Sequence, residues 1–147
     1  MNRDEIITLA RATACKHNLW PELVCAIVEQ ESGFNPWAMR YEPAFFFRYI
    51  QPLREAGQIK TETEARARAF SWGLMQVMGQ VAREHGFAGQ YLSALCEPEI
   101  GLDVGCRVFN AKLARAEGNL RNALLIWNGG SRPEYANEVL ARVEKFA

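Results

Sequence analysis

Helical periodicity extends over almost the whole chain, and no strand pattern of comparable length competes with it. Apolar residues recur at spacings of three and four, which places them on one face of an α-helix. Segments with this spacing lie at 3–16, 21–32, 43–57, 61–69, 73–85, 98–117, 120–127 and 133–146. Proline or glycine stands at several of their ends, where helices usually begin and stop. The sequence therefore predicts an all-α fold with little or no β-structure.

Length and charge narrow the class of protein further. A chain of 147 residues is long enough for one domain with a substantial core, so we expect a single domain over 1–147. Its 17 basic and 17 acidic side chains balance, which removes any general attraction to nucleic acid or to an anionic membrane. No apolar run is long enough to span a bilayer. We therefore expect a monomer that neither binds nucleic acid nor inserts into a membrane.

The residues that most often bind metals or form disulfides show no site pattern. The chain has four cysteines and two histidines, at Cys15, Cys25, Cys96, Cys106, His17 and His85. None of them forms a Cys-x-x-Cys pair or another zinc-ligand spacing, and isolated cysteines are commonly small buried thiols. We therefore expect no metal and no cofactor. Disulfides across the fold stay an open alternative.

The N-terminus does not resemble a signal peptide. Asp4 and Glu5 stand where such a peptide carries basic residues, and Arg11 interrupts the apolar run that should follow. We therefore expect the protein to be made in the cytoplasm without a signal peptide.

One predicted helix carries an acidic residue on its apolar face. The helix begins at Pro21, a favourable first residue, and is stopped by Gly33 and Pro36. Its apolar stripe consists of Trp20, Leu23, Val24, Ile27 and Val28, and the next position on that face is Glu31. A carboxyl group in poorly hydrated surroundings has a raised pKa, and glycosidic bond cleavage requires a carboxylic acid that stays protonated near neutral pH. The alternative is an ordinary solvated helix end, for which Glu29 is the natural candidate.

Three short motifs follow one another along the chain. They are Glu31-Ser32-Gly33-Phe34-Asn35-Pro36, then Gly73-Leu74-Met75-Gln76-Val77-Met78, then Ile126-Trp127-Asn128-Gly129-Gly130 with Tyr135 behind it. Each motif alone is weak. All three in this order, each on the expected helix or turn, resemble the soluble lytic transglycosylase (SLT) family. The resemblance covers residues 5–143 and implies the helical, lysozyme-like fold of goose-type lysozyme.

The resemblance also implies a reaction and a catalytic residue. The family cuts the β-1,4 bond between N-acetylmuramic acid and N-acetylglucosamine in peptidoglycan, so glycan strands are the expected partner. Glu31 would protonate the bridging oxygen and then, as a carboxylate, take the proton from the C6 hydroxyl. This hydroxyl closes a 1,6-anhydro sugar without water. The acetamido oxygen of the substrate would stabilise the cationic intermediate, so no second carboxylate is needed.

The same motifs supply candidate substrate-binding residues. Gly73 would let the backbone approach a sugar ring, Met75 would form a soft apolar wall, and Gln76 would match acetamido groups and hydroxyls. Simpler roles compete at two positions: Met75 as a core side chain, and Asn128 as part of a structural turn. The expected substrate-binding set is Ser32, Arg40, Glu42, Gly73, Met75, Gln76, Trp127, Asn128 and Tyr135.

The chain departs from the family pattern at four places. Trp127 stands where the family usually has tyrosine, and an indole can only donate a hydrogen bond to the catalytic carboxyl. Arg40 replaces a serine and puts a cation near the cleft, and Gly79 replaces a proline after the second motif. The fourth departure is an inserted helical segment at about 41–70, which we expect to form a lid or wall of the cleft.

Other functions stay open. Glu42, at a suitable distance from Glu31, would activate water and make the protein a lysozyme-like muramidase; its simpler role is a favourable charge at a helix start. A remote alternative is a non-catalytic helical binding module. Such a module would use basic residues at Arg66, Arg68, Arg107, Lys112 and Arg115. A bare catalytic domain without a leader also looks like a phage or prophage endolysin, which acts on the bacterial cell wall in host lysis or as part of a virion.

Overall fold

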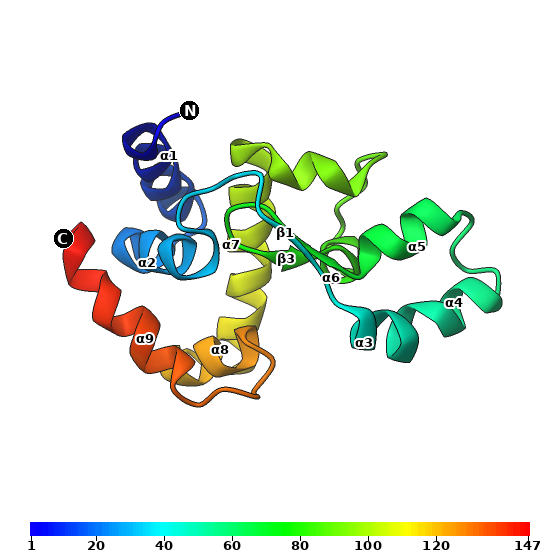
Figure 1. Ribbon diagram of the computed structural model, residues 1–147. Helices are drawn as coiled ribbons and strands as arrows, with labels where there is room; N and C mark the ends of the chain where they lie inside the picture. The colour runs from blue at the N-terminus through cyan, green and yellow to red at the C-terminus, as the bar shows by residue number, and fades with distance from the viewer.

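Helix α7 (Pro98–Arg115) runs through the middle of the molecule, and the other long helices pack around it (Figure 1). Helix α1 (Arg3–Lys16) packs on both α7 and α2 (Pro21–Ser32). Helix α8 (Leu120–Trp127) follows α7 and packs on it, and α9 (Tyr135–Arg142) returns along α2. The chain thereby brings its N-terminal and C-terminal thirds into contact.

The computed structural model describes residues 1–147. The remaining elements are short: β1 (Met39–Tyr41), α3 (Pro43–Phe45), the π-helical turn η1 (Phe46–Ile50), α4 (Gln51–Glu55), α5 (Glu62–Arg68), β2 (Phe70–Trp72), β3 (Val77–Met78), α6 (Gly79–Glu84), and the 3₁₀ turns η2 (Leu92–Cys96) and η3 (Val143–Phe146). The predicted helices over 3–16, 21–32, 98–117 and 120–127 are confirmed, and so is the mostly helical fold.

Local sequence signals account for where the first helices begin and end. Asn2 and Glu5 form a capping box on α1, with hydrogen bonds of 2.9 and 2.7 Å between each side chain and the other residue's backbone N–H. Pro21 occupies the first turn of α2, and Gly33 ends that helix in the left-handed conformation, with a φ of 59°. The sequence around α2 therefore fixes Glu31 in its last turn.

A small antiparallel sheet interrupts the helical pattern. Strand β2 lies between β1 and β3, and Arg40 is opposite Ser71. The helix predicted over 73–85 is wrong in its first half, because a turn and β3 precede α6. Gly73 and Gln76 have φ values of 70° and 52°, which a right-handed helix excludes.

The buried apolar residues form two clusters. The larger contains 30 residues and joins α1, α2, α7, α8 and α9. The smaller lies within residues 43–69, here called the side lobe, which projects away from α1, α2 and α9 in Figure 1. Its members are Phe46, Ile50, Ile59, Ala65 and Ala69. The side lobe is thus packed around apolar contacts of its own, while α5 also contacts α6 and η2.

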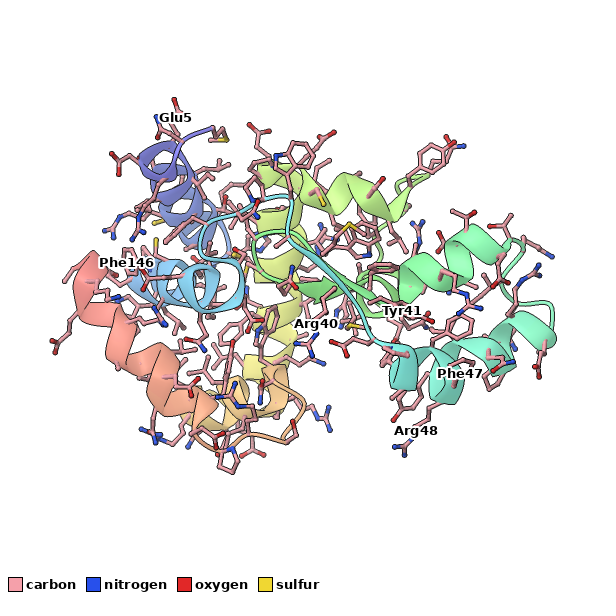
Figure 2. All side chains as sticks on the ribbon, viewed as in Figure 1. Glu5, Arg40, Tyr41, Phe47, Arg48 and Phe146 are labelled. Atoms are coloured by element: carbon pink, nitrogen blue, oxygen red, sulfur yellow. The ribbon has the colours of Figure 1, made fainter.

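Helical spacing over 43–57 predicts Phe46, Phe47, Tyr49 and Ile50 on the inward face of a helix, and two of these residues differ from that expectation. Phe46 and Ile50 are buried, but Phe47 and Tyr49 are 58% and 48% exposed. Figure 2 shows Phe47 on the outer side of the lobe. The π-helical turn adds a residue to the turn and shifts the helical register, so a pattern drawn on regular α-helical spacing assigns these two side chains to the wrong face.

The cysteines are free, and three of them, Cys25, Cys96 and Cys106, are buried. Burial raises the pKa of Cys25 to about 11 and that of Cys106 to about 12, so these thiols are unreactive core groups. No group of three or more histidine, cysteine or acidic side chains is close enough to hold a metal ion. None of the helices combines the length and the hydropathy needed to cross a membrane.

Candidate active site

Glu31 lies in the last turn of α2 and faces the start of α9. Its side chain is partly buried, and the buried hydroxyl of Tyr135 donates a hydrogen bond to its Oε2 atom. Burial raises the pKa of Glu31 above the ordinary value for glutamate. The Tyr135 hydrogen bond, the charge of Arg132 and the indole of Trp127 each act in the opposite direction without cancelling this effect. The site therefore favours the protonated acid.

The hydroxyl of Tyr135 is tuned by the same contact. Burial, the neighbouring charge of Glu31 and the hydrogen bond to it all raise the pKa of Tyr135. The phenol therefore stays protonated and remains a donor to the carboxyl group. Helix α9 thus supplies a fixed partner for one oxygen of Glu31.

A cleft of about 820 Å³ opens beside Glu31, within the size range of small-molecule sites. Its walls come from α2, the β-sheet, the start of the side lobe, α7, and the segment from the end of α8 to the start of α9. Seven of the residues predicted for the site line this one cleft: Glu31, Arg40, Glu42, Gln76, Trp127, Asn128 and Tyr135. Residues about a hundred positions apart in sequence are therefore brought together at one surface.

Three other predicted substrate-binding residues lie outside the cleft. The hydroxyl of Ser32 contacts the carbonyl oxygens of Val28 and Leu74 at 3.0 and 2.8 Å, and so joins α2 to the turn before β3. Gly73 allows a close approach between its own backbone and that of η2, not between the backbone and a sugar ring. A Cβ atom at this position would lie 2.4 Å from the Leu95 carbonyl oxygen. The expectation that these residues line the cleft is wrong, because each is occupied in internal packing.

Met75 is the third of these residues, and it is a core side chain. It is fully buried, and its sulfur lies 2.3 Å from where a Cβ atom at Gly105 would stand. The expected role as an apolar wall of the cleft is therefore wrong, and the simpler core role applies. Gly105 on α7 is the residue that makes room for it.

Gln76 and Asn128 both bring amide groups to the cleft. Gln76 has the unusual φ of 52° for a non-glycine residue, and its Nε2 atom donates to the carbonyl oxygens of Ala38 and Gly73 at 3.0 and 2.9 Å. Both donor hydrogens are thus used internally, and Oε1 is left to accept from a ligand. Asn128 caps the end of α8, and its buried Nδ2 atom has no hydrogen-bond partner, an uncommon state for a buried donor.

Arg40 and Glu42 form an ion pair at the other side of the cleft. Arg40 Nε lies 3.1 Å from Glu42 Oε1, and Arg40 is the more exposed of the two. The cation that acts on the pKa of Glu31 is Arg132, not Arg40. No sequence motif indicated Arg132, which belongs to the loop after the third motif and pairs with Glu134 and Glu138 at 3.1 and 2.7 Å.

Glu29 is not the solvated helix end that the sequence suggested. Its side chain is only 11% exposed and accepts from Arg142 at 2.7 Å, Lys145 at 2.9 Å and Arg3 at 3.0 Å. Burial alone would raise its pKa, but the hydrogen bonds from these three cations outweigh burial and lower it. Glu29 therefore ties α2 to α1, α9 and η3.

Most basic residues that a nucleic-acid module would use are neutralised locally. Arg66, Arg68 and Arg107 each pair with an acidic residue one helical turn earlier, at 2.8, 2.7 and 2.9 Å. Lys112 differs, because it lines the cleft. The basic residues therefore do not form a free positive surface of the kind that phosphate binding requires.

Comparison with known proteins agrees with this site. The sequence pattern of the family described as "Transglycosylase SLT domain" matches residues 8–141. The chain is also similar to the type IV secretion system protein virB1 of Brucella abortus and of Brucella melitensis, with 27% identity over 154 residues. The alignment covers 92% of this chain but 63% of those proteins, so the chain spans less than two thirds of their length. No solved structure gives a significant match. Because the family pattern extends over most of the chain, the protein belongs to the SLT family of lytic transglycosylases, enzymes that act on peptidoglycan.

Proposed function

We propose that this protein cuts the β-1,4 bond between N-acetylmuramic acid and N-acetylglucosamine and leaves a 1,6-anhydro end. The observation that carries the proposal is Glu31: a partly buried carboxyl with a raised pKa, hydrogen-bonded by Tyr135 at the wall of a cleft. A general acid of this kind protonates the leaving oxygen of a glycoside at neutral pH.

Bond cleavage takes two proton transfers at the same residue. In the first, Glu31 gives its proton to the bridging oxygen, the bond from that oxygen to C1 breaks, and the acetamido oxygen of the substrate stabilises C1. In the second, the Glu31 carboxylate takes the proton of the C6 hydroxyl, and O6 bonds to C1. Glu31 ends protonated as it began, and no water is consumed. The Tyr135 hydroxyl stabilises the carboxylate between the two steps.

The other cleft residues support binding of an amide-bearing sugar. Gln76 Oε1 is free to accept from an acetamido N–H. Trp127 packs edge-on against Phe109 with ring centroids 5.6 Å apart, which holds the indole beside Glu31. Since an indole donates only, it lowers the pKa of Glu31 and favours the carboxylate required in the second step.

The test is mass spectrometry of fragments released from purified peptidoglycan, with and without borohydride reduction. Fragments one water lighter than hydrolysis products and resistant to reduction support the proposal, and Glu31→Gln should release none. Equal release by wild type and Glu31→Gln would remove Glu31 from the mechanism.

Hydrolysis is the second candidate, because Glu42 lines the same cleft as Glu31. It forms an ion pair with Arg40, and in a hydrolytic reaction its carboxyl group would accept a proton from water. Inverting glycosidases place such a pair of carboxyl groups about 6.5–9.5 Å apart. Hydrolysis gives reducible muramic acid ends, and Glu42→Gln should then abolish their release. A loss below about threefold would remove Glu42 as the base, since general base catalysis contributes on the order of 10²–10⁴.

We also propose that residues 1–147 act as one monomeric catalytic domain and that the side lobe is an insert forming one wall of the cleft. The supporting observations are its own apolar cluster and the position of Phe45 on the cleft wall. Removing 43–69 and joining the ends through a short glycine linker should weaken binding of glycan fragments more than it lowers the unfolding temperature. A variant that simply unfolds would contradict this assignment.

The cellular setting is the bacterial cell wall, and two forms of it are proposed. One is phage-type lysis of the host cell. The other is local opening of the wall at an envelope-spanning assembly, which the names of the Brucella relatives suggest. Expression in a bacterial host distinguishes them: lysis that depends on a co-expressed membrane pore supports the first, whereas wall cleavage without lysis supports the second.

A further inference from the structure

Lys112 is the cation of the cleft that has no partner within the protein. Arg40 pairs with Glu42 at 3.1 Å, and Arg132 pairs with Glu134 and Glu138 at 3.1 and 2.7 Å. No carboxylate and no hydrogen-bond acceptor of the chain contacts the Lys112 ammonium group, although the residue is half-buried and lines the same cleft. An ammonium group at a cleft wall without a partner in the chain is free to pair with an anionic group of a ligand.

Helix α7 fixes the direction of Lys112. Val108 and Lys112 stand four positions apart and both line the cleft, as residues on one helix face do. Val108 is buried in the large cluster, so this face of α7 is anchored while the lysine stem extends along the wall and its charged end reaches the open space. The charge of Lys112 is also separate from the catalytic acid, because Arg132 supplies the charge that acts on the pKa of Glu31.

The chemistry of the substrate indicates what this cation meets. The sugar rings of peptidoglycan are neutral, and the lactyl group of muramic acid is joined to the stem peptide through an amide. The anionic groups of the polymer are therefore the carboxylates of the stem peptides. We propose that Lys112 binds a stem-peptide carboxylate, so that the cleft favours glycan that carries peptides over glycan from which they have been removed. This inference rests on the proposed function and adds a specificity-determining residue to it.

Binding to defined fragments tests the inference without turnover. The probes are two soluble tetrasaccharides of alternating N-acetylglucosamine and N-acetylmuramic acid, one with its stem peptides and one with free lactyl groups blocked as methyl amides. Calorimetry in the Glu31→Gln background measures Kd for each. We expect Lys112→Met to weaken binding of the peptide-bearing fragment by about fivefold or more, as for loss of a partly buried charged hydrogen bond, and to leave the peptide-free fragment unchanged.

Two further variants define the role of the charge. Lys112→Arg should restore at least part of the preference, whereas Lys16→Met, a matched change at an exposed position of α1, should have no effect. Raising the salt concentration should reduce the preference of the Lys112 protein and not that of Lys112→Met. Equal loss on both fragments would mean that Lys112 contacts sugar or supports the fold, and no loss on either would mean that it binds nothing; both results overturn the inference.

Failure of the proposed function gives a different result. If the protein binds the fragments with the expected preference but releases no anhydro product, the cleft recognises stem peptides and the proposed reaction is wrong. A protein that binds neither fragment contradicts both proposals.

Discussion

Replacing Glu29 by glutamine should destabilise the protein and loosen the site without touching the cleft. The change keeps the shape of the side chain but leaves Arg142, Lys145 and Arg3 without their shared carboxylate. The pair with Arg142 is the least exposed, at 34% for the arginine and 11% for Glu29, and a hydrogen bond between charged groups contributes about 1.5–3 kcal/mol. The other two cations are more than half exposed, so each adds only a few tenths of a kcal/mol.

These terms give a loss of about 2–3 kcal/mol in the free energy of unfolding. For a chain of this length, such a loss lowers Tm by roughly 5–10 °C. Because α2 carries Glu31 and α9 carries Tyr135, weaker contact between these helices should also reduce kcat. Thermal unfolding followed by circular dichroism measures the first effect, and release of soluble fragments from peptidoglycan measures the second.

The pH dependence gives this prediction a second check. The pKa of Glu29 is lowered in the folded protein, so its contribution to stability is present above the ordinary pKa of glutamate and is lost as pH falls through the folded value. The Tm difference between wild type and Glu29→Gln should therefore disappear when the pH falls below the pKa of Glu29 in the folded protein. Glu62→Gln is the matched control, since Glu62 pairs with Arg66 at 2.8 Å but is 60% exposed. A loss for Glu29→Gln no larger than that for Glu62→Gln would refute the reasoning.

Three other predictions follow from the site and its supports. Tyr135→Phe removes the donor to Glu31, so the pKa of Glu31 should rise further and kcat should fall about tenfold or more. In the pH profile of kcat/KM, the alkaline limb should move to higher pH. A limb that moves to lower pH would contradict the assignment. Glu31→Gln should be more stable than wild type at pH 8 and no more stable near pH 3. The reason is that an acid whose pKa is raised in the folded protein contributes stability that is lost as pH rises through that value. Measurement of Tm for both proteins across this pH range tests the prediction. Gly105→Ala should lower the free energy of unfolding by about 1–3 kcal/mol, since the new methyl group would clash with Met75. Denaturant titration measures this loss. If no loss is found, α7 can shift away from Met75.

The sequence by itself determined the elements that depend on neighbours along the chain. The Asn2–Glu5 capping box and the Pro21 and Gly33 signals are local, so the bounds of α1 and α2 and the place of Glu31 could be read directly. Helical spacing also predicted the mostly helical fold, and three ordered motifs indicated the family that the comparison then showed. These properties are set by backbone preferences and by contacts over a few residues.

Only the tertiary structure decided which motif residues reach the cleft. Gly73 and Met75 share a motif with Gln76, yet contacts with Leu95 and Gly105, distant in sequence, draw the first two into the interior, while Gln76 stays on the cleft wall. Glu29, by contrast, gains three cations from the two ends of the chain. Burial and charge depend on what the fold brings from elsewhere, and a pattern along the chain contains only the local part of that information.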